Sequence, residues 1–243
     1  MNKDKLSAEE LVGRWEERRE IKNLMGRYAV SFLLKKEPTM FADFWSARDD
    51  VSMGLNDGWY VGREAIAAWF AAIDRATALK AELLKADLPD KLEGQDLQEL
   101  YGIGDFDVKP LGTPVIELAD DLKTAKGIWN VRGSTCRLTE AGPVANWIFG
   151  WAAVDFVLED GEWKILNLLL VYNVDHQCGT AFTEPEKQFD PVPEFAAMAE
   201  FRMPEPNVPM QVMETFYPDR PKVRSPRIPE PYESFDKTFH YGV

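Results

Sequence analysis

Apolar side chains in the first part of the chain recur at roughly helical spacing. The positions that share one face of the predicted helix are Leu11, Trp15, Ile21, Met25, Tyr28 and Phe32. Ser7 followed by Glu10 is typical of a capping box, so the helix is expected to begin just after Ser7. Pro38 ends it, because proline does not fit a helix interior. The same proline can open a short second helix with the apolar residues Phe41, Phe44 and Trp45.

A polar tripeptide, Asn56-Asp57-Gly58, separates two short apolar runs and predicts a hairpin. The runs are Val51 to Leu55 and Trp59 to Val61, and the turn is expected to use positive φ values, which Asn, Asp and Gly accept at low cost. A third helix is predicted from about Arg63 to about Leu84, with its core side formed by Ile66, Trp69, Phe70 and Ile73. The polar stretch that follows contains a candidate short helix at Asp96 to Tyr101.

From about Val108 the apolar period becomes that of strands. The predicted strands are Val108 to Leu118, Thr124 to Leu138, Val144 to Glu159 and Glu162 to Val174. Such long antiparallel strands must twist and curl, and glycines at positions where bends or bulges fit are Gly127, Gly133 and Gly150. Helices followed by a strand meander predict an α+β fold: a cone in which N-terminal helices pack on a curved antiparallel sheet.

The chain changes character from Cys178 onward. Eleven of its sixteen prolines lie after residue 180, which argues against long regular elements there. Only Val192 to Phe201 is compatible with a short helix, yet the segment is rich in Phe, Tyr and Met, unlike a typical disordered tail. We therefore expect a domain over residues 1–177 and a proline-rich extension over residues 178–243. The extension would wrap across this domain or a partner subunit.

Composition narrows the classes of function. Hydrophobic residues make up 45% of the 243 residues, and no apolar run approaches the roughly 20 residues of a membrane span. Because the charged N-terminal stretch lacks the apolar core of a signal peptide, a cytoplasmic location is expected. A net charge of −13 disfavours nucleic acid and anionic membranes as partners.

The motifs of cofactor and metal chemistry are missing from the sequence. Cys136 and Cys178 do not have a metal-binding spacing, and a reducing compartment makes a disulfide between them unexpected. The sequence contains neither a glycine-rich phosphate loop nor a nucleophile elbow. No cofactor and no metal are therefore expected.

The order of short motifs resembles the SnoaL-like branch of the nuclear-transport-factor-2-like superfamily. The similar stretches are Gly26-Arg27-Tyr28-Ala29, Asp57-Gly58, Gly62-Arg63-Glu64-Ala65-Ile66, Thr124-Ala125-Lys126-Gly127-Ile128-Trp129 and Asp160-Gly161-Glu162-Trp163-Lys164-Ile165. The resemblance spans residues 8–176 and leaves the last 65 or so residues outside. It implies a cone that opens between helices and sheet, and assembly as a homodimer or homotrimer through the outer face of the sheet.

Enzymes of this family include polyketide cyclases, dehydratases, ketosteroid isomerases and cofactor-free lyases, while other members bind ligands without known chemistry. Several catalytic members carry a Tyr and an Asp on the first helix and a His on the first long strand. Tyr28 matches that tyrosine, whereas the aspartate position falls near Leu33 and the histidine position near Leu111 to Thr113. The dehydratase His–Asp pair is therefore missing.

Three side chains are candidates for acid–base or oxyanion chemistry. His176, at the end of the last strand, is either a base that works near neutral pH or a surface histidine. Tyr28 can donate a hydrogen bond to a developing oxyanion, or it is an ordinary core tyrosine. His240 gains interest only if the extension folds over a pocket.

Strand register decides the role of several further polar residues. Asn130 and Arg132 share one strand face; on the concave face they would bind an anionic group, and on the convex face they would meet solvent or a partner subunit. Asp155 is a base if it faces inward, although an outward direction is favoured. Asp43 and Lys109 are weaker acid–base candidates, and Asn146 and Asn167 are either structural hydrogen-bond ties or ligand contacts.

Aromatic residues are the expected lining of a pocket for a flat hydrophobic ligand. The expected substrate-binding residues are Trp45, Trp59, Trp69, Trp129, Trp147, Tyr172 and Asn173, and core or subunit-interface positions are the alternative for most of the tryptophans. The sequence thus favours a lyase that eliminates water or a small carbonyl compound from a hydrophobic, hydroxylated aromatic or polycyclic molecule. An isomerase or cyclase, and a non-catalytic binding or assembly module, are the alternatives.

Overall fold

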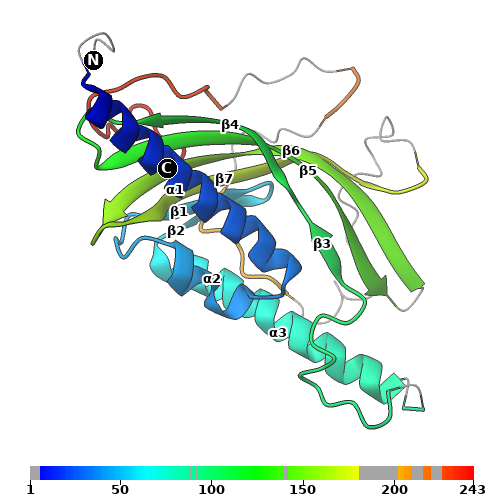
Figure 1. Cartoon of the computed structure of the whole chain (residues 1–243). Helices are drawn as coiled ribbons and strands as arrows, with labels where there is room; N and C mark the ends of the chain where they lie inside the picture. The colour runs from blue at the N-terminus through cyan, green and yellow to red at the C-terminus, as the bar shows by residue number, and fades with distance from the viewer. Residues whose placement is uncertain are drawn as a thin grey trace.

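The computed structural model describes residues 6–87, 89–90, 92–139, 142–180, 202–209, 216–219 and 226–243. Three helices lie on one side of a curved sheet (Figure 1). They are α1 (Ala8–Leu33), α2 (Glu37–Phe44) and α3 (Arg63–Asp87). The helix expected at 192–201 falls outside the described residues, and the one expected at 96–101 is a series of turns.

Helix α1 begins as its sequence predicts and buries only its second half. Ser7 and Glu10 form the reciprocal capping box. The buried positions are Ile21, Leu24, Met25 and Tyr28. The prediction that Leu11 and Trp15 share this core face is wrong, because these side chains are 50% and 62% exposed. Arg14 and Arg18 instead attach this end of the helix to the β4 strand and the turn after it.

The strands form one open, mixed sheet. Their bounds are β1 Ser52–Leu55, β2 Gly58–Val61, β3 Phe106–Val108, β4 Leu111–Leu118, β5 Thr124–Thr139, β6 Gly142–Glu159, β7 Glu162–Gln177 and β8 Val208–Pro209. The order is β3-β5-β6-β7-β1-β2-β8, and β4 also pairs with β5. The α+β fold is thus confirmed. The sheet departs from the expected antiparallel one, because β1 runs parallel to β7.

Two local predictions change in the structure. The run predicted as one strand from Val108 is interrupted, so that β3 and β4 pair with β5 separately. The hairpin turn at Asn56 and Asp57 forms as expected, but neither residue has the positive φ that was predicted. A register shift in β6 falls at Gly150, one of the three glycines expected to mark bends or bulges.

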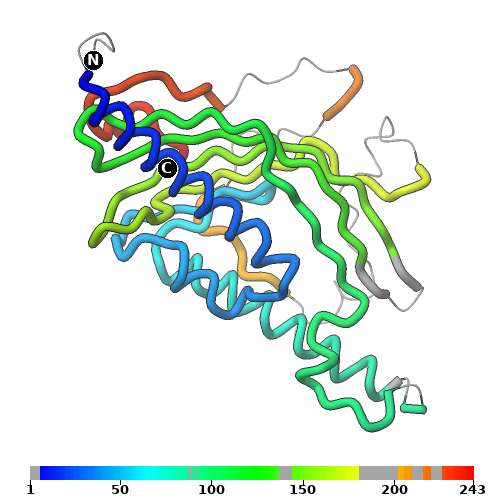
Figure 2. The backbone as a smooth tube through the Cα atoms, in the orientation of Figure 1, coloured from blue at the N-terminus to red at the C-terminus, as the bar shows by residue number. Residues whose placement is uncertain are grey.

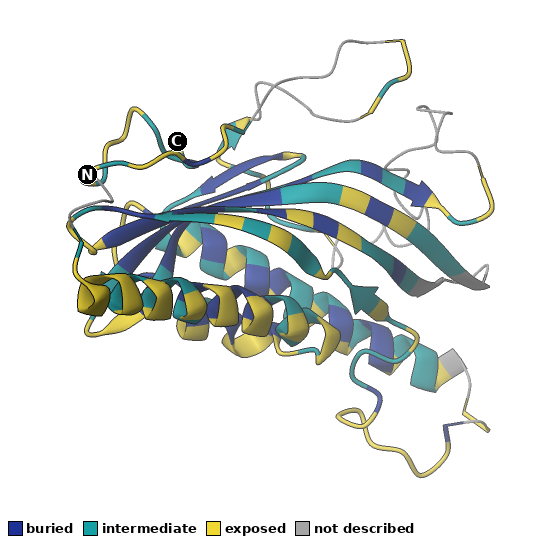
Figure 3. Cartoon of the chain, turned by 45° about the horizontal axis from the view of Figure 1, so that its top comes forward, coloured by how far each residue is buried: buried dark blue, intermediate teal, exposed yellow. Residues whose placement is uncertain are grey.

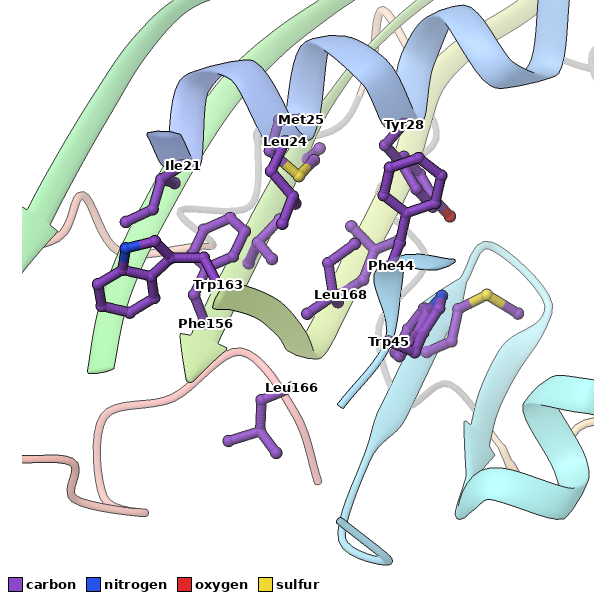
Figure 4. Packing of buried hydrophobic residues seen from close by; sticks show 14 of the residues in the cluster. Ile21, Leu24, Met25, Tyr28, Phe44, Trp45, Phe156, Trp163, Leu166 and Leu168 are labelled. Atoms are coloured by element: carbon purple, nitrogen blue, oxygen red, sulfur yellow. The ribbon is translucent and has the colours of Figure 1, made fainter. Parts of the chain in front are cut away.

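The hydrophobic core lies between the helices and the sheet. Figure 4 shows Ile21, Leu24, Met25 and Tyr28 pointing from α1 toward side chains of the sheet, including Phe156. Phe44 and Trp45, at the end of α2, close the same core from another side. The sheet therefore has a helix-covered face, which we call the inner face, and an opposite outer face.

The C-terminal chain lies on the outer face. Figure 3 shows the helices on one side of the sheet and the C-terminal chain on the other, and Figure 2 follows this chain past the turn between β4 and β5. The backbone N–H of Tyr241 donates a hydrogen bond to Asp155, and that of Asp120 donates to Tyr232. Earlier in this segment, β8 extends the sheet next to β2.

Candidate functional site

Strand register assigns each candidate side chain to one face of the sheet. Neighbouring residues of a strand point to opposite faces, and directly paired residues share a face. Trp129 pairs with Ala152 and packs edge-on against Phe156 in the core, so this set lies on the inner face. Ile148 belongs to the core and points to the inner face, so its neighbour Trp147 points to the outer face. His176 pairs directly with Trp147 and therefore shares the outer face.

Tyr28 is held among aromatic rings inside the inner face. Its ring stands edge-on to Phe32 and to Phe44, with centroids 5.4 Å away in each case. Burial raises the pKa of the Tyr28 phenol far above its usual range, and neighbouring Tyr172 adds to the increase. Tyr28 therefore stays protonated at physiological pH, which is the form that can donate a hydrogen bond to an oxyanion.

Lys109 connects Tyr172 with an acidic side chain. Its ammonium lies 2.8 Å from Asp107 Oδ2 and 5.5 Å from the ring centroids of both Phe32 and Tyr172. Burial raises the pKa of Tyr172, and Lys109 partly offsets the increase. The side-chain amide of Asn56 fixes the backbone here, because it donates to Tyr172 O and accepts from Tyr172 N.

Glu37 is a buried carboxyl group at the first position of α2. Only 3% of the residue is exposed, and its Oε2 has no hydrogen-bond partner among the described residues. Burial raises its pKa, which its own backbone N–H, Lys35 and Lys109 offset only in part. Glu37 therefore holds a proton at a higher pH than an exposed glutamate does.

Two residues of β6 and β7 complete the polar groups of the inner face. Asn146 donates to Asp175 at 2.7 Å, and Asp175 in turn raises the pKa of Tyr172. Thr135 pairs with both Asp107 and Asn146, so the three occupy one row across the sheet. We call the set Tyr28, Glu37, Asp107, Lys109, Asn146, Tyr172 and Asp175 the inner polar cluster.

Comparison with known proteins identifies the family. The profile of the SnoaL-like domain matches residues 13–168. The chain belongs to the SnoaL-like domain family. Similar solved structures include the dehydrochlorinase LinA-type3, which acts on hexachlorocyclohexane, from Novosphingobium barchaimii (16% identity, 74% of this chain and 98% of that chain, TM-score 0.44). A Kribbella flavida protein gives 15% identity, 67% and 95% coverage, and a TM-score of 0.48. No curated protein matches the sequence.

The outer face of the sheet in this SnoaL-like chain carries the predicted site residues Asn130, Arg132, Trp147 and His176. Asn130 and Arg132 are exposed there, which agrees with the convex-face alternative, in which they meet solvent or a partner subunit, and not with the concave-face one. Trp147 is 53% exposed on the same face. His176 is buried, and its Nδ1 lies 2.7 Å from Thr180 Oγ1. The sheet separates all four from Tyr28, so the structure does not bring the predicted catalytic residues into one site.

The predicted aromatic lining is also divided between the faces. Trp45 and Trp129 are buried in the main core, and Trp69 packs against that core from α3. Trp59 pairs with Gly54 on the outer side. Tyr172 lies in the inner polar cluster, whereas Asn173 occupies the bulge of β7, where its carbonyl accepts a hydrogen bond from Phe216 N.

The remaining candidates have structural partners. Asp155 points to the outer face, as favoured, but it is fully buried and accepts hydrogen bonds from Lys126 and Asn167. His240 Nδ1 accepts from Gly242 N, and burial lowers its pKa. The Asp43 carbonyl oxygen accepts from Lys164.

Sequence reasoning missed two members of the inner polar cluster. Glu37 gives no signal in the sequence, because it lies beside Pro38 at a helix start, where an acidic residue is ordinary. Asp107 falls just before the predicted strand, and Lys109 is only a weak candidate. Asp107 and Lys109 are two residues apart, which places both side chains on one face of a strand, and this spacing is the signal that the sequence offers.

No described helix has the length and apolar character needed to cross a bilayer. Within the same residues no group of three or more His, Cys, Asp or Glu side chains is arranged to hold a metal ion.

Proposed function

We propose that this SnoaL-like domain is a cofactor-independent lyase that acts by elimination on a hydrophobic hydroxylated small molecule. The observation that carries the proposal is the position of two phenols, the buried Tyr28 and the partly buried Tyr172, in one cluster with Glu37, a buried carboxyl group whose Oε2 has no hydrogen-bond partner among the described residues. Phenolic donors stabilise an enolate oxygen, and a nearby carboxyl group transfers the proton that elimination requires.

In the proposed dehydration, Asp107 is the base and Glu37 is the acid. The Oδ1 of Asp107 has no partner among the described residues, so it can accept the proton from the carbon next to a carbonyl group. The electron pair of that C–H bond forms the enolate, which the phenols of Tyr28 and Tyr172 stabilise. The enolate then expels the β-hydroxyl group, which takes a proton from Glu37 and leaves as water.

The same groups support loss of a carbonyl compound from an aldol. Asp107 then takes the proton of the hydroxyl group, and the bond between the α- and β-carbons breaks. The resulting enolate is stabilised by the same phenols and receives a proton from Glu37. His176 takes no part in either route, because it lies on the outer face.

The Tyr28→Phe variant tests the proposal with the aldol adduct of benzaldehyde and acetone as substrate. Dehydration gives benzylideneacetone and cleavage gives benzaldehyde and acetone, so absorbance distinguishes the two routes. Loss of the phenolic donor is expected to slow turnover at least about tenfold with the fold intact. Tyr232→Phe, on the outer face, is the control and should leave turnover unchanged. Turnover that survives Tyr28→Phe removes this phenol from the mechanism, and an inactive parent protein rejects elimination of this substrate.

A further inference from the structure

Hydrogen-bond acceptors without partners gather in the inner polar cluster. Among the described residues, five buried side-chain polar atoms have no hydrogen-bond partner, and three are oxygens of this cluster. They are Glu37 Oε2, Asp107 Oδ1 and Asn146 Oδ1. Buried polar atoms in folded proteins are nearly always bonded, so a concentration of exceptions indicates a place where an outside group donates. Acceptor oxygens call for donors, which means hydroxyl groups rather than ethers.

The charges in the cluster favour a neutral ligand over an anionic one. The ammonium of Lys109 is already paired with Asp107 at 2.8 Å, and Asp175 adds a second carboxylate nearby. An anionic ligand would meet these two carboxylates without a surplus positive charge. A hydroxylated group without charge satisfies the oxygens and avoids this repulsion.

Aromatic side chains give the cluster an apolar side. Phe32 contacts the Lys109 ammonium through its ring face and stands edge-on to Tyr28. Phe44 also stands edge-on to Tyr28. Lys109 and Asp107 side chains keep 17% and 19% exposure, so the polar end of the cluster is reached from solvent. These contacts suit a ligand with an aromatic body and a hydroxylated end.

We propose that the inner polar cluster is a binding subsite for the neutral diol end of an aromatic compound. The inference rests on the proposed function for the position of the site and adds the substrate class. Asp107 and Asn146 accept hydrogen bonds from the hydroxyl groups, the protonated carboxyl group of Glu37 forms a further hydrogen bond with one of them, and the rings of Phe32 and Phe44 lie beside the aromatic body.

Three probes test this subsite in the full chain. They are styrene glycol, its dimethyl ether and mandelate, with dissociation constants measured by titration in NMR. Styrene glycol is expected to bind at least about fivefold more tightly than either of the others, because the ether cannot donate and mandelate is an anion. Equal affinity for glycol and ether, or tighter binding of mandelate, would overturn the proposal.

The Asp107→Asn variant is expected to weaken the discrimination against the anion. It removes one of the two carboxylates, the one that pairs with Lys109, so the cluster loses one negative charge and its affinity for mandelate should rise at least about fivefold. Glu162→Gln is the matched control, because it removes the carboxylate of an exposed ion pair with Lys164 at the far end of β7. The control should keep the preference for the glycol. A folded Asp107→Asn protein whose affinity for mandelate does not rise would contradict the inference.

A second variant keeps the test decisive if Asp107→Asn does not fold. Asn146→Ala removes one acceptor oxygen without changing the charge, so the affinity for styrene glycol should fall about fivefold while that for mandelate stays unchanged. Unchanged glycol affinity would count against the subsite.

Failure of this inference differs from failure of the proposed function. Selective glycol binding without turnover rejects only the lyase, and aldol turnover with the opposite binding preference rejects only the subsite.

Discussion

At the scale of single residues, Glu37 shows how burial changes the chemistry of a common side chain. The first turn of a helix normally favours an ionised glutamate, because backbone N–H groups point toward it. Burial at this position outweighs that effect and raises the pKa of Glu37. Such a group costs stability when it ionises and can act as an acid in a site.

The Glu37→Gln variant should be more stable than the parent protein at neutral pH. Because the folded-state pKa lies above the unfolded value of about 4.5, the carboxyl group contributes most to stability below pH 4.5. That contribution is lost as pH rises from 4.5 through the folded-state pKa. Glutamine does not titrate, so its advantage in the free energy of unfolding should grow over this range. Urea unfolding at several pH values measures it.

Glu64→Gln provides the comparison for this pH dependence. Glu64 also lies in the first turn of a helix but is exposed. Its replacement should change the free energy of unfolding by less than about 1 kcal/mol at neutral pH, through the helix dipole alone. An advantage of Glu37→Gln that is the same at pH 4 and at pH 7 would show that ionisation of Glu37 is not its cause.

At the scale of elements, glycines set how closely the long strands pack. The register between β6 and β7 shifts at Gly150. A Cβ atom added to Gly150 would lie 2.0 Å from the carbonyl oxygen of Val171, which is backbone and cannot move aside cheaply. The bulge therefore depends on the absence of a side chain at this position.

Gly150→Ala is expected to lower the free energy of unfolding by about 1–3 kcal/mol, because the new methyl group must push the strands apart. Gly26→Ala is the matched change in α1, where an added Cβ meets nothing within 4 Å. Since alanine favours helix, that variant should gain about 0.5–1 kcal/mol. Chemical denaturation compares them, and equal effects of the two variants would refute the role given to the Gly150 contact.

At the scale of the whole molecule, the C-terminal chain covers a buried ion pair on the outer face. Lys126 and Asp155 lie 2.8 Å apart, and their side chains are 1% and 0% exposed. The ammonium faces four rings of the C-terminal chain at 4.9–5.6 Å, which are those of Tyr232, Phe235, Phe239 and Tyr241. This contact attaches the end of the chain to the middle of the sheet.

Lys126→Met should therefore destabilise the molecule strongly. It leaves Asp155 as a buried carboxylate without its cation, which costs about 3–5 kcal/mol. Lys164→Met breaks the exposed pair with Glu162 and should cost no more than about 1 kcal/mol. Thermal unfolding of both variants gives the comparison. Similar melting temperatures would mean that the buried ion pair contributes no more to stability than the exposed one.

The sequence by itself determined where most elements begin and end. The capping box at Ser7, the start of the short helix at Pro38 and the hairpin turn at Asn56 act through neighbouring residues, so local chemistry suffices to locate them. The end of α1 at Leu33, by contrast, lies several residues before Pro38, which was predicted to end it. The long strands were visible for the same reason, because their apolar period and the turn at Asp160 and Gly161 are local signals.

Only the tertiary structure decided which side chains meet. A shift of one residue in register moves a side chain to the other face of the sheet. Only the observed pairing therefore shows that His176 and Arg132 lie on the outer face, across the sheet from Tyr28. The burial of Glu37 and its nearness to Lys109 likewise depend on how α2 packs against strands that follow much later in the chain. A site assembled from distant elements is fixed by long-range packing, which no local pattern records.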